Sequence, residues 1–349
     1  MNDSSGNIEP VKLGNRMVGP GFPVFLVADI ANCHEGDFET AKRMIERIAH
    51  SGVDAVKFQL HVPEAEMTRS HPKFETQTRR SLPASALTAL KAYAESLGLY
   101  FLCTPFSRQA ADELEAIGVD AFKIGSGETS DFPFLEYVAR KRKPMILSTG
   151  MTAWQEIEGA VEIVKRHGAP FLLLHCVSIY PPSYERLNLG VMAKLRERFR
   201  VPVGLSDHTT EIYSAIAAVP LGVHLIEKHY TLDRSQSGTS DHKVSLEPQE
   251  WDALVDAVRK IERACGDEKR IFAEEEPVVS WARHGVIAAR DLTPGDVITA
   301  DMVTTKRPLY GGIHAKELPS VLGRKVRVLV KADSILHWAD IETGENYAP

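Results

Sequence analysis

Two lysines stand at positions where a charged side chain is costly. Lys57 and Lys123 lie within short apolar runs, 55–59 and 121–124, and a buried ammonium group is expensive to desolvate unless an anion pairs with it. With the hydroxyl groups of Thr104, Ser126 and Ser206, the two lysines would form a cationic cup for a phosphate and a carboxylate on one small molecule. Two alternatives stay open: a pair of internal salt bridges, or a lysine that forms a Schiff base.

Two of the thirteen histidines also stand out by position. His208 and His229 follow or end two successive apolar runs, 202–206 and 224–229. If these runs are neighbouring strands, the two imidazoles could bind one catalytic metal ion whose other positions are filled by water and substrate. The alternative is one core histidine and one surface histidine. Glu128, in the turn after residues 121–124, is a candidate for proton handling or for orienting water, with a structural role as the alternative.

A regular alternation of elements predicts how these residues are held. Short apolar runs at 25–31, 55–59, 100–104, 121–124, 144–148, 171–175, 202–206 and 224–229 alternate with segments of helical spacing, among them 38–51, 84–97, 108–117, 154–167, 213–221 and 250–265. Eight such repeats predict an α/β fold, a (β/α)8 TIM barrel. An open doubly wound sheet is less favoured because no G-x-G-x-x-G follows the first run. Every run ends in polar residues, where barrel enzymes place their active sites.

The pattern changes after residue 265. We predict a barrel domain over 1–270 with an N-terminal extension over 1–22, a charged linker over 271–282, and a small β-rich domain over 283–349. The small domain shows short β segments separated by turn residues. At roughly 65 residues it is near the lower limit for an independent core, so we expect it to lean on the barrel or on a second subunit.

Composition excludes several classes of function. Hydrophobic residues make up 44% and charged residues 25% of the chain, and the net charge is −6, which argues against nucleic acid as the main partner. No apolar run is long enough to cross a bilayer, and the polar start lacks the core of a signal peptide. We therefore expect no membrane partner and a cytoplasmic location. The four widely spaced cysteines fit neither a zinc nor a disulfide pattern.

Taken together, these residues resemble the N-acetylneuraminate (sialic acid) synthase family, which includes legionaminate and pseudaminate synthases and the spore coat polysaccharide biosynthesis protein E branch. The resemblance runs from residue 25 to residue 342. The segments that carry it are 55–59 (AVKFQ), 104–107 (TPFS), 122–128 (FKIGSGE), 147–151 (LSTGM), 174–176 (LHC), 204–209 (GLSDHT), 227–229 (EKH), 241–243 (DHK), 245–248 (SLEP) and 306–308 (KRP).

The resemblance implies a barrel followed by an antifreeze-like (SAF) domain, in a domain-swapped homodimer whose SAF domain reaches the partner's active site. It implies that phosphoenolpyruvate is held by Lys57, Thr104, Lys123, Ser126 and Ser206, with Ser178 replacing the asparagine usual in the family. Sugar contacts would come from Gln59, Tyr180, Asp241 and, for the N-acyl group, Arg307. His208 and His229 would hold Mn2+ or Mg2+, and the catalytic set would be Asp29, Lys57, Lys123 and Glu128.

The expected activity is therefore condensation of phosphoenolpyruvate with an N-acyl amino-sugar aldehyde, such as N-acetylmannosamine, for a cell-surface or spore-coat polysaccharide. Two departures concern the sugar: the end of the first strand, and the segment 68–80, which would cover the sugar and matches the family poorly. The family's first strand usually ends in glutamate followed by an asparagine–histidine pair, and the matching positions here are Asp29, Cys33 and His34. The alternatives are a phosphoenolpyruvate-dependent or Schiff-base aldol enzyme acting on another aldose, and a non-catalytic carbohydrate-binding homologue.

Overall fold

The chain folds into two units, which we describe separately. The computed structural model describes residues 8–308 and 311–342, and the units are Met1–Gly266 and Asp267–Pro349. Residues 1–7 of the predicted extension and residues 343–349 of the predicted small domain lie outside the described residues.

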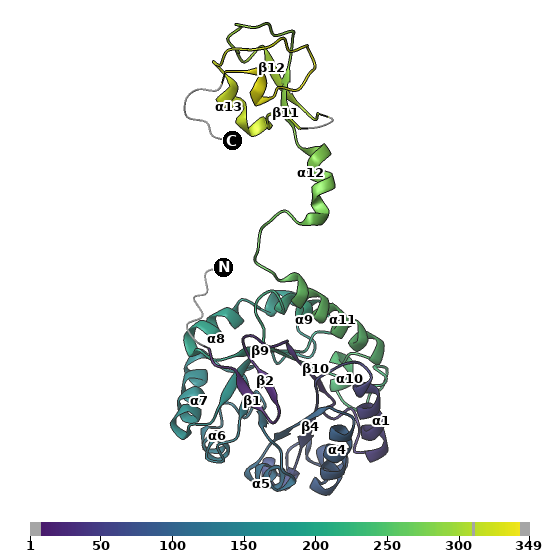
Figure 1. The fold of residues 1–349 in the computed structure, drawn as a ribbon. Helices are drawn as coiled ribbons and strands as arrows, with labels where there is room; N and C mark the ends of the chain where they lie inside the picture. Colours follow the sequence, from purple (N-terminus) through teal and green to yellow (C-terminus); the bar gives the residue numbers. More distant parts are fainter. Residues whose placement is uncertain (1–7, 309–310, 343–349) are drawn as a thin grey trace. The chain divides into compact units, whose positions relative to one another are not determined.

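The first unit is a TIM barrel, as predicted. Its eight parallel strands follow the order β5-β4-β3-β10-β9-β8-β7-β6. The first and last strands of this order, β5 and β6, pack against each other and nearly close the ring. The helices surround this ring of strands (Figure 1). The strands are β3 (Phe25–Asp29), β4 (Ala55–Leu60), β5 (Tyr100–Pro105), β6 (Phe122–Ile124), β7 (Met145–Ser148), β8 (Phe171–Cys176), β9 (Val203–Asp207) and β10 (Leu225–His229).

Eight of the described helices, one after each strand, cover the outside of the barrel, and local signals set several of their ends. Asp37 accepts a hydrogen bond from the backbone N–H of Thr40 at 2.6 Å and so caps α1. Ser107 caps α5 in the same way through Ala110 at 3.1 Å, and Gly118 ends α5 in the left-handed conformation, with φ at 81°. The helices are α1 (Phe38–Ala49), α4 (Ala84–Ser96), α5 (Arg108–Ile117), α6 (Phe132–Ala139), α7 (Trp154–His167), α8 (Val191–Phe199), α9 (Tyr213–Ala218) and α11 (Pro248–Ala264).

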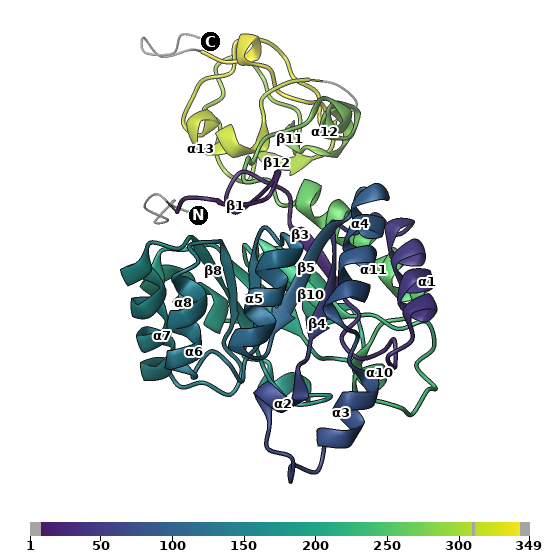
Figure 2. The same ribbon diagram turned by 90° about the horizontal axis from the view of Figure 1, so that it is seen from below.

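The two ends of the barrel differ. A hairpin of β1 (Val11–Leu13) and β2 (Arg16–Val18) lies at the end where the strands begin, and its apolar side chains pack into the lower barrel core against residues such as Phe25 and Tyr100. The short helices α2 (Pro63–Glu66) and α3 (Phe74–Arg80) lie at the opposite end, where the strands finish (Figure 2). The hairpin therefore closes one end of the barrel and leaves the carboxyl ends of the strands for a site.

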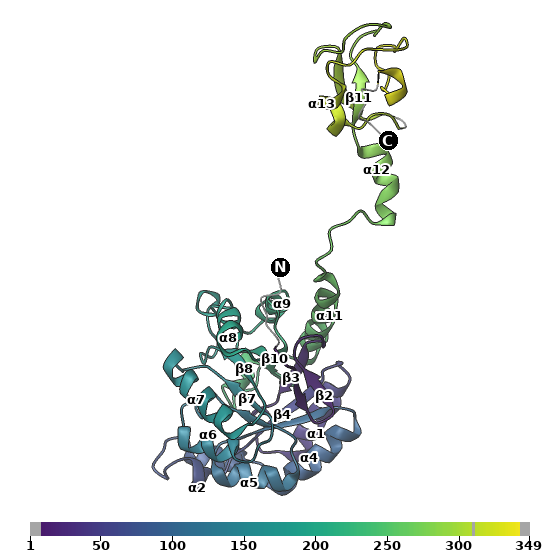
Figure 3. The same cartoon turned by 60° about the vertical axis from the view of Figure 1, so that its left-hand side comes forward.

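The second unit has a core of its own. Strands β11 (Gly285–Ala288) and β12 (Val303–Lys306) pair antiparallel, and α13 (Leu318–Val321) belongs to the same unit. Its buried cluster includes Val286, Ile313 and Leu336. The chain enters this unit through α12 (Glu276–Ala282), a helix within the predicted linker (Figure 3). None of the described helices is long and apolar enough to span a bilayer.

Candidate active site

A cavity of about 330 Å³ lies at the carboxyl ends of the barrel strands. A larger hollow of about 510 Å³ on the outer surface, beside α6 and α7, is lined by none of the buried polar residues. The structure brings all the sequence-predicted site residues except Asp241 and Arg307 to the smaller cavity. Those that line it are Asp29, Lys57, Gln59, Thr104, Lys123, Ser126, Glu128, Ser178, Tyr180, Ser206, His208 and His229.

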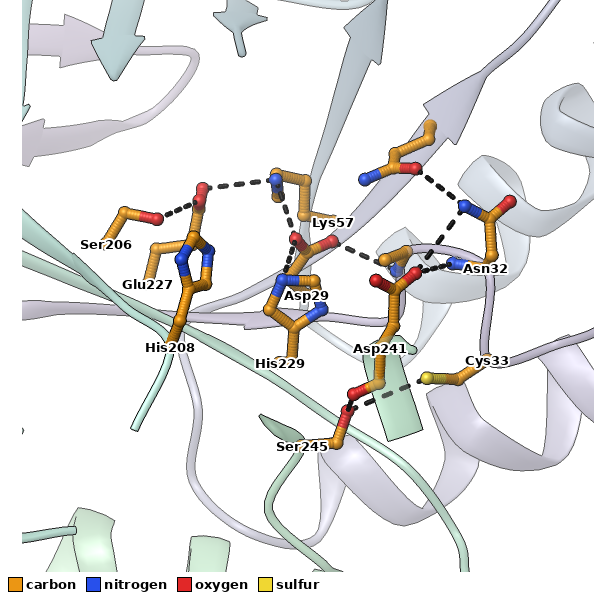
Figure 4. A network of polar contacts seen from close by, with 12 residues as sticks. Asp29, Asn32, Cys33, Lys57, Ser206, His208, Glu227, His229, Asp241 and Ser245 are labelled. Carbon is orange, nitrogen blue, oxygen red and sulfur yellow. Dashed lines mark hydrogen bonds and ion pairs between the residues drawn. The ribbon is translucent and has the colours of Figure 1, made fainter. Parts of the chain in front are cut away.

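A row of charged side chains crosses the floor of this cavity. Strand register places Asp29 opposite both Lys57 and His229 on its neighbouring strands. The Asp29 carboxylate lies 2.8 Å from Lys57 Nζ and 3.7 Å from His229 Nε2, and its other oxygen accepts a hydrogen bond from the backbone N–H of Ala31. Figure 4 shows Asp29 between the lysine and the histidine. Asp29 thus both caps a turn and joins the charged row.

Glu227 continues the row and was not among the predicted site residues. Its carboxylate lies 3.4 Å from Lys57 and 3.5 Å from Lys123, and it accepts a hydrogen bond from Ser206 at 3.0 Å. Burial opposes its ionisation, but the two lysines outweigh burial and lower the pKa of Glu227 to about 2. One signal could have found it: Glu227 is two residues before His229 on the same strand, so both side chains face the same side.

The two lysines therefore form salt bridges within the protein and also line a cavity. The internal salt bridges and the cationic cup, which were alternatives in the sequence analysis, are compatible with each other in the structure. Burial disfavours the charge on Lys57, yet Asp29 and Glu227 raise its pKa above the ordinary value. For Lys123 burial prevails over Glu227 and lowers the pKa. Lys123 Nζ also donates to Ser148 Oγ at 2.7 Å. Lys57 is thus a fixed positive charge, and Lys123 is the lysine that gains most from an incoming anion.

The two histidines meet at one wall of the cavity. Their ring centroids lie 5.4 Å apart. His208 Nδ1 lies 3.0 Å from the backbone oxygen of Val177, so Nδ1 carries a hydrogen, and in the neutral ring Nε2 has the free lone pair that a metal ion needs. His229 Nδ1 is buried and has no hydrogen-bond partner among the described residues. A buried imidazole nitrogen without a described partner, on a ring next to a second imidazole, fits a pair of metal ligands.

The chain itself supplies only part of such a metal site. No group of three or more histidine, cysteine, aspartate or glutamate side chains within residues 8–308 and 311–342 is arranged to hold a metal ion. His208 and His229 would thus provide two ligands, and water or substrate would provide the others. Open positions of this kind distinguish catalytic metal sites from closed structural ones.

A buried ion pair on the outer side of the strands supports both histidines. Asp207 and Lys228 precede His208 and His229 and face each other in register. Lys228 Nζ lies 2.9 Å from the Asp207 carboxylate and donates to the backbone oxygen of Thr209 at 2.6 Å. The side chains of Asp207 and Lys228 are at most 1% exposed. The pair therefore ties together the two strand ends that carry the histidines.

Glu128 lies in the turn after β6 and lines the cavity without a salt-bridge partner among the described residues. Burial raises its pKa to about 7. Such a carboxyl group can donate or accept a proton near neutral pH, which a carboxylate with an ordinary pKa does poorly.

The residues predicted to face a sugar form a second, polar side of the site. Gln59 lines the cavity, and its side-chain oxygen accepts from Asn32 Nδ2 at 3.3 Å. Asp241 does not line the cavity but accepts from the backbone N–H of Asn32 at 3.3 Å. Cys33 is absent from the described cavity lining, because its buried thiol contacts Ser245 Oγ at 3.6 Å (Figure 4). Asn32, which sequence reasoning passed over, is therefore the residue that links Asp241 to Gln59.

Arg307 belongs to the second unit. Its exposed guanidinium group lies 5.3 Å from the centre of the Trp281 ring, a cation–π arrangement. No described carboxylate lies within ion-pair distance of it.

Comparisons with known proteins agree with this site. Residues 44–270 match the NeuB family, and residues 283–342 match the SAF domain. The chain is 36% identical to an N,N'-diacetyllegionaminic acid synthase of Campylobacter jejuni, covering 89% of this chain and 98% of that one. It is 35% identical to a human N-acetylneuraminate-9-phosphate synthase, covering 92% and 93%. A crystal structure of a sialic acid synthetase from Leptospira borgpetersenii, in complex with citrate, superposes with a TM-score of 0.73 at 33% identity, covering 78% and 95%.

Proposed function

This chain belongs to the NeuB family, and from that membership we propose that it condenses phosphoenolpyruvate with an open-chain N-acyl amino sugar and releases phosphate. The observation that carries the proposal is the cavity itself. It places the lysines Lys57 and Lys123, the acids Asp29 and Glu227, and a histidine pair at the mouth of one barrel. The product would be a nonulosonic acid for a cell-surface polysaccharide.

Phosphoenolpyruvate would occupy the side of the cavity lined by lysine and hydroxyl groups. Lys123 gains an anionic partner there, and Ser126 and Ser206 supply hydroxyl groups. Thr104 Oγ1 is buried without a hydrogen-bond partner among the described residues, and such a group is costly until a ligand satisfies it. The lysine ammonium groups would hold the phosphate and carboxylate in place through the reaction.

The reaction would form one carbon–carbon bond and break one carbon–oxygen bond. C3 of phosphoenolpyruvate attacks the aldehyde carbon of the sugar, whose oxygen takes up a proton and becomes a hydroxyl group. Water adds to the cationic C2 and loses a proton, and the C2–O bond to phosphate then breaks. Glu128, with its pKa raised to about 7, is placed to move one of these protons. The two substrates and water thus give a keto acid and inorganic phosphate.

We also propose that His208 and His229 hold a divalent cation, Mn2+ or Mg2+. When bound, the cation would polarise the sugar's carbonyl group. Alanine at either position should weaken metal binding greatly, as read by calorimetric titration, and should abolish turnover. Chelation should do the same reversibly. Full turnover by chelator-treated, metal-free protein would rule this part out.

We further propose that the protein acts as a homodimer in the cytoplasm, with Arg307 of one subunit serving the barrel of the other. The family resemblance, which implies such a dimer, supports this proposal, as does an exposed guanidinium group without a described carboxylate partner. The cytoplasmic location agrees with four free cysteines, because disulfides are rare in that compartment.

The test of the main proposal is phosphate release from phosphoenolpyruvate with a panel of N-acyl hexosamines and simpler aldoses. One phosphate should appear for each sugar consumed, and none without sugar. Trapping of a lysine adduct by borohydride would instead support a Schiff-base aldolase. Lys123 is the better candidate for such an adduct, because its pKa is lowered whereas that of Lys57 is raised. Sugar binding with no turnover would support a non-catalytic carbohydrate-binding protein.

A further inference from the structure

A histidine–glutamate pair beside the cavity has no role in the reaction described above. His61 directly follows β4, and Glu66 ends the short helix α2. Their side chains are 8% and 9% exposed, and His61 Nδ1 lies 2.9 and 3.0 Å from the two oxygens of Glu66. The His61 ring stacks on Phe106, with ring centroids 4.2 Å apart. Since burying such a pair is costly, it needs an explanation.

Donor and acceptor can be assigned for each hydrogen bond around this pair, starting from the carboxylate of Asp241. An ionised carboxylate can only accept hydrogen bonds, and Asp241 Oδ2 lies 3.5 Å from the side-chain nitrogen of Asn32. The oxygen of the same Asn32 amide accepts from Gln77 Nε2 at 3.1 Å. The NH2 group of Asn32 therefore faces Asp241 and Gln59, because the opposite orientation would set its oxygen against a carboxylate.

The orientation of the Asn32 amide then fixes the donor and acceptor atoms of Gln59 and His61. The NH2 group of Asn32 donates to Gln59 Oε1 at 3.3 Å, so this atom must be the amide oxygen. The same oxygen lies 3.0 Å from His61 Nε2, which must then donate a hydrogen. His61 Nδ1 faces Glu66, whose carboxylate only accepts. Both ring nitrogens of His61 therefore face acceptor oxygens, an arrangement that a doubly protonated ring satisfies.

The neighbouring His34 shows the opposite arrangement. Burial first, and repulsion by His61 second, lower the pKa of His34 to about 4. His34 is therefore neutral, and its Nδ1 accepts a hydrogen bond from the backbone N–H of Gly36 at 3.0 Å. Of these two buried histidines, only His61 has a carboxylate against its ring.

We propose that His61 and Glu66 are positioning residues that set the orientation of the Gln59 amide. The imidazolium holds the amide oxygen on the protein side, so the NH2 group of Gln59 points into the cavity. The site then offers a hydrogen-bond donor, and it selects sugars with a hydroxyl or carbonyl oxygen at that point. The identity of this ligand as a sugar rests on the proposed function, but the orientation itself does not.

The kinetic test compares two variants of one short helix. Glu66→Gln keeps an acceptor for His61 Nδ1 but removes the negative charge that favours a second proton on the ring, so His61 can become neutral with a bare Nε2 and the Gln59 amide is free to turn. The KM for the sugar should rise about tenfold, the usual effect of losing one good hydrogen bond, while the KM for phosphoenolpyruvate and kcat should stay within about twofold. The control is Glu64→Gln, because Glu64 is exposed on the same helix. An unchanged sugar KM in Glu66→Gln would overturn the proposal.

A second measurement does not depend on any substrate. In the full-length protein labelled with 15N-histidine, nuclear magnetic resonance at neutral pH should show two protonated ring nitrogens for His61. The signals are assigned by their loss in His61→Gln, with the exposed His71→Gln as control. One bare ring nitrogen would overturn the proposal even if Glu66→Gln does not fold. Two protonated nitrogens in a protein that turns over no sugar would support the orientation and contradict only the proposed function.

Discussion

Glu128 should make the stability of the folded protein depend on pH. Its pKa of about 7 in the folded protein is above the ordinary value of 4.5. As pH rises from about 4.5 to about 7, the unfolded chain loses this proton before the folded protein does, so the folded state is progressively destabilised. Glu128→Gln has no proton to lose. Its stability relative to the parent should therefore increase between pH 5 and pH 8, by on the order of 2 kcal/mol.

Urea unfolding at the two pH values measures this difference. A constant difference would show that Glu128 ionises as an ordinary surface carboxylate. The same variant tests the chemical role, because loss of a proton-transfer group should lower kcat by about a hundredfold or more. A kcat within a few-fold of the parent would assign Glu128 a structural role.

Asp29 bears on the choice of sugar. Its carboxylate is held by Lys57 at 2.8 Å and is shorter than the glutamate expected at this position by one methylene, ~1.5 Å. A catalytic group misplaced by ~1 Å can cost on the order of a hundredfold in rate. We therefore predict that another N-acyl amino sugar turns over faster than N-acetylmannosamine, and that Asp29→Glu shifts the preference toward N-acetylmannosamine.

Relative kcat/KM values across a sugar panel, for the parent and for Asp29→Glu, check this prediction. The idea is wrong if N-acetylmannosamine is already as fast as the best sugar and Asp29→Glu changes nothing. Cys33 also departs from the residue usual in the family, but it gives no support for a changed sugar, because its thiol contacts Ser245 and does not line the cavity.

Some residues of the site could be predicted from the sequence, and others could not. The strand-end lysines and histidines were predictable, because barrel strands direct such side chains to one end. Glu227 could have been found from its alternation with His229. The links from Asn32 to Gln59 and from His61 to Glu66 could not, because they depend on how loops after different strands fold back on each other.

At the scale of elements, the outward ion pair Asp207–Lys228 should support both stability and metal binding. Lys228→Met leaves the Asp207 carboxylate buried without its cation, which should destabilise the barrel by about 3–5 kcal/mol. It should also weaken metal binding, because the strand ends that carry the histidines are no longer tied. Lys260→Met is the matched control, since Lys260 pairs with Asp256 on an exposed helix face and both side chains are 62% exposed.

Urea unfolding and calorimetric metal titration read the two effects. The double variant Asp207→Asn/Lys228→Met should recover part of the lost stability, because it removes the uncompensated charge. A Lys228→Met variant no less stable than the Lys260→Met control would contradict the role assigned to the buried pair.

The eight barrel strands were predictable as apolar runs that alternate regularly with helices, and six of the flanking helices were predictable from their helical period. The hairpin β1–β2 and the four-residue helices α2 and α10 (Asp241–Val244) were not, because they lie outside this alternation and carry too little pattern of their own. These short elements matter for the site: α2 carries Glu66, and α10 begins with Asp241. Part of what sequence reasoning missed therefore lies on the side of the cavity that we propose faces the sugar.

At the scale of the whole molecule, the proposed dimer makes a prediction about mixed subunits. If Arg307 serves the partner's barrel, an Arg307→Ala chain combined with a Lys123→Ala chain gives one site with both parts intact. Each variant alone should be nearly inactive, and the verified heterodimer should recover a substantial fraction of the parent activity per intact site. No recovery would indicate that the second unit serves its own barrel.

The central claim is that this protein breaks the C–O bond of phosphoenolpyruvate while joining it to a sugar. The most direct measurement uses phosphoenolpyruvate labelled with oxygen-18 at the bridging position, together with the best sugar of the panel. C–O cleavage predicts that the released phosphate carries the label and appears in equal amount to the sugar consumed. Unlabelled phosphate, which marks P–O cleavage by simple hydrolysis, or phosphate released without sugar consumption would contradict the account.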